Sequence, residues 1–215
     1  MKLEITKACA DSLRTFIQNH YGIQLKSSHA HELVAAYLGY SSRAALLADK
    51  ICPIDNLKDA AIIILSGRTH FVEQRLKTLE NLPTGLPSSD ILVQVLCMPI
   101  ITSEDFSGKV RNDLQEVAIA YADHRAFEKL RMYEIDPIEL DFLKTFDQNE
   151  RETDILMTVI YDFPAKAKKP QRHSSVKVTL PRIAGGIGFG IPTALPTFYA
   201  GHMVDPDYRL AHGID

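Results

Sequence analysis

Apolar residues change their spacing along this chain, from the period of a helix to the alternation of a strand. Near the N-terminus, Leu13, Phe16 and Ile17 form one stripe at helical spacing. Residues 175–183 instead alternate apolar and polar side chains, as a half-buried strand does. Because the strand patterns follow a run of helical patterns, the sequence predicts a segregated α+β fold, with a helical N-terminal half followed by a β-rich C-terminal part.

The expected elements give a first division of the chain. We predict a small helical module at residues 1–52 and an α+β domain at 53–215, with its strands mainly after residue 154. Expected helices cover residues 3–19, 29–38, 69–82 and most of 103–132, and Ser41 and Ser42 offer a cap for a further helix. Expected strands cover residues 60–65, 155–163 and 175–183.

Charge is distributed unevenly along the chain. The formal net charge is only −3, which argues against a protein whose whole surface coats nucleic acid. Residues 1–103 hold 10 Lys/Arg and 9 Asp/Glu, residues 104–162 hold 7 and 15, and residues 163–215 hold 7 and 3. The sequence therefore predicts a neutral N-terminal part, an acidic middle and a basic C-terminal part.

The N-terminus and the cysteines indicate the compartment. Lys2, Glu4 and Lys7 interrupt any apolar core of a secretory signal, and the longest apolar run is far shorter than the ~20 residues that span a bilayer. The three cysteines have no metal-ligand or disulfide-framework spacing. We expect a soluble protein in the reducing cytoplasm, without membrane insertion.

No motif for catalysis, metal or cofactor binding is complete. His29 and His31 are two residues apart, so on a helix they point in different directions and cannot share an ion. The glycine run at 185–190 lacks the last glycine of a dinucleotide fingerprint, and a glycine-rich strand with close backbone approach is favoured. We predict no catalytic residue, no metal site and no cofactor, and a hydrolase using dispersed His and Asp/Glu stays as the second alternative.

A cluster of basic residues between two expected strands is the first candidate for a binding surface. Lys166, Lys168, Lys169 and Arg172 lie within seven residues and are flanked by prolines. Such a loop can contact an acidic protein patch or phosphates. We predict these four as partner-binding residues.

A second candidate lies in the N-terminal module. Two expected short helices are joined by Gly39, Tyr40, Ser41 and Ser42, which has the outline of a helix-turn-helix. A reading helix there would present Ser42 and Arg43 to DNA, followed by mostly apolar residues. A DNA-binding regulator is therefore the first alternative, while a small packing hairpin is favoured for this segment.

Residues 25–49 carry a resemblance. Their Ser-x-Ala-x-Glu-Leu helix entry, the Ala-Ala pair, the Leu-Gly-Tyr corner and the following Ala-Leu-Leu resemble a small helical module of glyoxalase-related and plasmid- or integron-borne accessory proteins. The metal ligands of glyoxalases are not located elsewhere in the sequence, so that activity is not carried over.

The small size and this module also resemble plasmid-encoded fertility-inhibition proteins. Those factors block conjugative transfer of a second plasmid, typically by acting on its coupling ATPase. The resemblance implies a cytosolic accessory or inhibitory factor that acts by protein–protein binding, with a conjugative coupling ATPase as the expected partner. No binding residue is carried over from that family.

Overall fold

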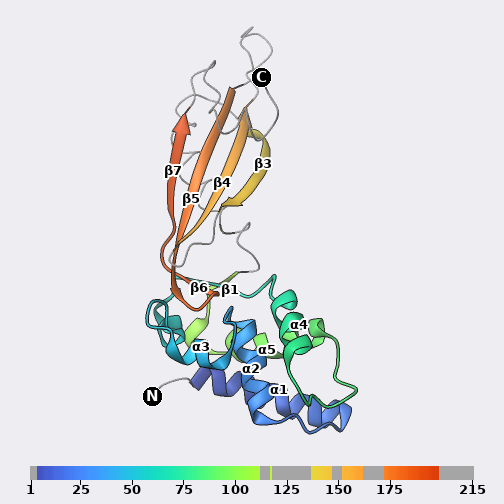
Figure 1. The fold of residues 1–215 in the computed structure, drawn as a ribbon. Coiled ribbons are helices and arrows are strands. Elements are labelled where there is room, and N and C mark those ends of the chain that lie inside the picture. Colours follow the sequence, from blue (N-terminus) through green and yellow to red (C-terminus); the bar gives the residue numbers. More distant parts are fainter. Residues whose placement is uncertain (1–3, 112–116, 118–136, 147–151, 162–171, 199–215) are drawn as a thin grey trace. The chain divides into compact units, whose positions relative to one another are not determined.

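A computed structural model of the chain describes residues 4–111, 117, 137–146, 152–161 and 172–198 (Figure 1). The fold is α+β, as predicted, with helices in the N-terminal half and a sheet in the C-terminal part. The described residues group into two compact units, of which residues 4–111 and 181–191 form the first. The units divide the chain at positions other than residue 52, because residues on both sides of that point share one core.

The first unit is mainly helical. Helix α1 packs against α2 and α5, and α4 packs against α2 and α5. Three leucine or isoleucine residues of α5, Leu92, Leu96 and Ile100, are spaced four apart and are fully buried, which is how a helix buries one stripe. The helices are α1 (Glu4–Tyr21), α2 (Ser27–Tyr37), α3 (Arg43–Ala48), α4 (Thr69–Thr78) and α5 (Ser89–Ile101), with 3₁₀ helices at Ile54–Asp59 and Glu104–Phe106.

The helices predicted at 3–19, 29–38 and 69–82 are confirmed, with differences at their ends. Helix α2 begins at Ser27 instead of His29. Helix α4 ends at Thr78 instead of residue 82, because Leu79 adopts an extended backbone and Asn81 a left-handed one with φ of 56°. The predicted stripe on α1 is confirmed, since Leu13 and Ile17 are buried and Phe16 packs partly against the core.

Short strands complete the first unit. Strand β1 (Ile62–Ile64) pairs in parallel with β2 (Val110–Arg111) and antiparallel with β6 (Gly188–Phe189). The last residues of β5 (Arg172–Ala184) pair with β6. The prediction of helix for most of residues 103–132 is wrong at Val110 and Arg111, because these residues pair with β1 and Gly108, with φ of 75°, turns the chain toward it. Residues 112–116 and 118–132 of that prediction lie outside the described residues.

The second unit is described through its strands. β3 (Pro137–Phe146) pairs antiparallel with β4 (Glu152–Tyr161), with Leu140 opposite Val159. The first part of β5 lies next to β4 and pairs antiparallel with β7 (Thr193–Phe198). The predicted strands at 155–163 and 175–183 correspond to β4 and β5, with residues 162 and 163 outside the described part of the chain.

Candidate functional site

The predicted basic cluster lies mostly outside the described residues. Lys166, Lys168 and Lys169 are not described, and Arg172 is the first residue of β5. Their role in partner binding stays a prediction. The geometry of a candidate site therefore comes from the first unit, around the connection between α2 and α3.

A tight corner joins these two helices. The backbone N–H of Gly39 donates to the carbonyl of Ala36 at 3.0 Å, and that of Tyr40 donates to Ala35 at 2.9 Å. Gly39 has φ of 90°, a conformation that favours glycine and ends the helix at the predicted position. The Leu-Gly-Tyr sequence is thus a helix stop that turns the chain toward α3.

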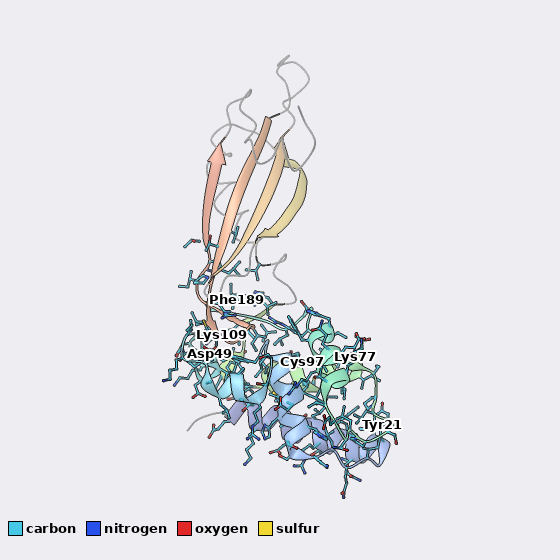
Figure 2. The ribbon with its side chains drawn as sticks, in the orientation of Figure 1. Tyr21, Asp49, Lys77, Cys97, Lys109 and Phe189 are labelled. Carbon is cyan, nitrogen blue, oxygen red and sulfur yellow. The ribbon has the colours of Figure 1, made fainter. Side chains whose placement is uncertain are left out.

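The Tyr40 side chain ties this corner to the loop that follows α3. Its hydroxyl lies 2.9 Å from Asp49 Oδ2 and 3.0 Å from the Cys52 carbonyl. Asp49 Oδ1 accepts the backbone N–H groups of Ile51 and Cys52 at 2.8 and 3.1 Å. Burial opposes the charge on Asp49, but these backbone donors and the Tyr40 hydroxyl outweigh it and lower the pKa of the carboxyl. Figure 2 shows Asp49 close to α3.

The glycine-rich turn between β5 and β6 packs onto the same corner. The backbone N–H of Gly186 donates to Leu38 O and that of Gly185 donates to Cys52 O, both at 2.7 Å. The Arg68 guanidinium donates to the Gly186 carbonyl. A Cβ on Gly186 would lie 2.9 Å from Arg68 Nη1. The glycines thus allow close backbone approach, as predicted, and these two N–H groups are used inside the protein.

Ser42 and Arg43, the residues of the DNA-binding alternative, begin α3. The Ser42 hydroxyl accepts the backbone N–H of Ala45 at 3.1 Å and caps the helix. The backbone N–H of Arg43 donates to Glu32 Oε2 at 3.0 Å, while its side chain is exposed. The serine thus has a structural role, and the arginine side chain points into solvent.

The outer surface of α3 is apolar. Leu47 is 57% exposed and Ile51 is 50% exposed, although both are large aliphatic side chains. Ala44 and Ala48 are exposed at the neighbouring helical positions. We call these four residues the α3 face. The sequence pattern predicts an apolar helix around Leu47 but does not give the direction of its side chain. In the structure α3 buries Leu46, and the next residue, Leu47, faces outward.

A pocket of about 410 Å³ lies beside the corner, and its lining includes Tyr40, Ser41, Phe71 and Arg75. One wall is charged, since Arg75 Nη2 lies 2.6 Å from Glu32 Oε2. This ion pair joins α2 to α4, and its two charges largely neutralise each other. The pocket therefore offers hydroxyls and aromatic surface but no clear excess of charge for a ligand.

Burial changes the pKa values of two cysteines and one arginine in the first unit. Burial raises the pKa of the Cys9 thiol to about 12, with a further rise from nearby Cys97. Burial also raises the pKa of Cys97, and both shifts disfavour the reactive thiolate. Burial lowers the pKa of Arg68 to about 10, which leaves the guanidinium charged at neutral pH.

Wider comparisons add no relative. No family model matches the chain, and neither curated proteins nor solved structures give a match. Among the residues that the structure describes, no three or more His, Cys, Asp and Glu side chains are grouped to hold a metal ion. Within that same part of the chain, no helix combines the length and the apolar character needed to cross a membrane.

Proposed function

We propose that this chain is a binding protein that acts through contact with another protein. The observation that carries the proposal is the exposure of Leu47 and Ile51 on the α3 face. Fully covering a large aliphatic side chain is worth about 1.5–3 kcal/mol, so two of them can anchor a contact. Clustered apolar exposure of this kind is typical of interaction surfaces.

The narrower proposal is an inhibitory factor of conjugative transfer that acts on a coupling ATPase. It is supported by the resemblance of residues 25–49 and of the small size of the chain to plasmid-borne factors. We expect the full chain, purified by affinity from cells that carry conjugative plasmids, to retain such an ATPase. The control is the Glu80→Gln variant, which changes an exposed side chain in the turn after α4. Absence of any specifically retained protein contradicts the proposal.

The basic cluster is tested by the transfer frequency itself. Replacing Lys166, Lys168, Lys169 and Arg172 together with alanine is expected to reduce inhibition of transfer, because an acidic partner loses four counter-charges. Unchanged inhibition removes the cluster from the binding surface. It leaves the α3 face as the candidate.

A DNA-binding regulator is the alternative, because Arg43 and Lys50 are both exposed near α3. The residues between them weaken it, since the alanines and Leu47 offer no hydrogen bonds to base edges. Phosphate contacts would make affinity fall steeply with salt. A mobility-shift titration that shows no binding at low salt excludes this alternative. The hydrolase alternative gains no support from Cys9 or Cys97, because burial raises the pKa of both thiols.

A further inference from the structure

The α3 face combines an apolar centre with basic ends. Ala44, Leu47 and Ala48 lie three and four residues apart, so they share one side of the helix, and Ile51 follows just after it. Leu46 points the other way and is buried. The outward apolar surface is therefore a property of the helix orientation, and Tyr40 and Ser42 hold that orientation through their hydrogen bonds.

Two cations flank this apolar centre without a matching anion. Arg43 begins the helix and Lys50 follows its end, and both side chains are exposed. Two carboxylates near these cations are already engaged: Glu32 pairs with Arg75, and Asp49 accepts from Tyr40 and from two backbone N–H groups. Within the described ranges of the chain, Arg43 and Lys50 have no ion pair.

We propose that the α3 face binds a short acidic, apolar segment of the partner protein. Aliphatic or aromatic side chains of that segment cover Leu47 and Ile51, and its carboxylates lie opposite Arg43 and Lys50. This inference rests on the proposed function and adds the chemistry of the partner. Apolar contact supplies most of the affinity, while the opposite charges select the partner and speed its association.

Two other occupants fit the face less well. A second copy of the chain, meeting face to face, would bring Arg43 and Lys50 near the same cations. A DNA backbone would satisfy the cations but would leave Leu47 and Ile51 against phosphate and sugar. An acidic, apolar peptide satisfies both parts of the surface.

A peptide-display selection tests this inference even while the partner protein is unidentified. The probe is a phage library of random 16-residue peptides, selected on the full wild-type chain and counter-selected on the Leu47→Asp variant. Leu47 is exposed, so the variant is expected to fold, which circular dichroism and the thermal midpoint check. We expect the selected peptides to combine Asp/Glu with large apolar residues.

The selected peptide is then synthesised and its affinity is measured by fluorescence anisotropy. We expect Leu47→Ala to weaken binding at least tenfold, as loss of a central apolar anchor does. Arg43→Glu with Lys50→Glu is expected to weaken it about tenfold at low salt, with a smaller difference at high salt. Glu80→Gln serves as the matched surface control and is expected to leave affinity unchanged.

Several results overturn the inference. These are selection of neutral or basic peptides, equal selection on the wild type and on Leu47→Asp, dimerisation of the wild type that Leu47→Asp abolishes, and a salt-sensitive shift of a DNA duplex that needs Arg43. The proposed function fails separately. If the affinity purification retains a partner equally well with wild type and Leu47→Asp, protein binding stands and the α3 face is excluded; if it retains none, protein binding itself is excluded.

Discussion

The hydroxyl of Tyr40 links two turns of the first unit. It lies within hydrogen-bond distance of Asp49 and of the Cys52 carbonyl, and its surroundings are partly buried. Tyr40→Phe removes the hydroxyl and leaves both acceptors with one partner fewer. We expect the free energy of unfolding to fall by about 1–3 kcal/mol. Urea denaturation measures it, and Tyr21→Phe, which changes an exposed tyrosine at the end of α1, is the control.

Comparing Tyr40→Phe with Tyr21→Phe separates the effect of losing these hydrogen bonds from the effect of removing a tyrosine hydroxyl. Equal midpoints for Tyr40→Phe and Tyr21→Phe would show that the corner does not depend on Tyr40. The same variant also tests the α3 face indirectly, because the loop after α3 holds Ile51 and Lys50. A loosened corner is expected to weaken binding of the selected peptide as well.

Gly188 is a second residue whose role follows from distance alone. A Cβ at this position would lie 2.8 Å from the Ala184 Cβ and 2.9 Å from Leu57 Cδ1, which is closer than side chains pack. We expect Gly188→Ala to lower the free energy of unfolding by about 1–3 kcal/mol through overpacking. Thermal unfolding followed by circular dichroism measures the change.

A compensating change provides the control for Gly188→Ala. Ala184→Gly removes the nearer of the two contacts, so the double variant is expected to regain part of the loss despite the entropic cost of a second glycine. If the double variant loses more free energy of unfolding than the two single variants lose together, steric overlap with Ala184 is not the cause.

At the scale of elements, α3 depends on its cap. Ser42 accepts the Ala45 N–H at the start of a helix that is too short to be stable alone. We expect Ser42→Ala to cost about 0.5–2 kcal/mol of stability. The neighbouring Ser41→Ala is the matched control and is expected to change little, since Ser41 is exposed and lies outside the cap position. Chemical denaturation of both variants makes the comparison, and equal losses would contradict the cap.

The ion pair between Glu32 and Arg75 joins α2 to α4, and Glu32 also accepts the first backbone N–H of α3. Both side chains are only about a fifth exposed, at 22% and 23%. We expect Glu32→Gln to lower stability by about 1–3 kcal/mol, because a partly buried guanidinium loses its counter-charge. Denaturant midpoints at low and high salt measure this effect.

Its control is the exposed pair on α4 between Glu73 and Lys77. Glu73→Gln is expected to leave the midpoint unchanged, because solvent already screens that pair. If Glu73→Gln lowered stability as much as Glu32→Gln, burial would not explain a difference in strength between the two ion pairs.

The sequence predicted those helix ends that depend on the conformational preference of a single residue. Gly39 marked the end of α2 and Ser42 the cap of α3, and both follow from the conformational preferences of single residues. Val110 was missed as a strand because its partner Ile63 lies far away in the sequence. The partner of Glu32, Arg75, lies on another helix, so local spacing in the sequence does not predict this ion pair. Exposure of Leu47 likewise depends on how α3 packs, which periodicity alone does not give.

At the scale of the whole molecule, the first unit is built from two distant segments. Residues 181–191 belong to the same compact unit as residues 4–111. They supply β6, which pairs with β1, and the buried side chains Ala184, Ile187 and Phe189. A chain that ends before them leaves the edge of β1 and part of the core uncovered. The helical N-terminal half is therefore not complete without a short piece of the C-terminal part.

This dependence gives a prediction about shortened chains. Residues 1–114 alone lose the burial of Ile187 and Phe189, worth about 3–6 kcal/mol together, which is a large share of the stability of a small unit. We expect that chain to bind a hydrophobic dye and to unfold with low cooperativity. Joining residues 181–191 to it through a Gly/Ser linker of about 20 residues, with a typical span of about 25 Å, is expected to restore a cooperative transition. Ile187→Asp in the joined chain is expected to abolish the cooperative transition, because the recovery depends on the burial of Ile187 in the core. A cooperative transition for residues 1–114 alone, at the midpoint of the joined chain, would show that the unit folds without the glycine-rich turn.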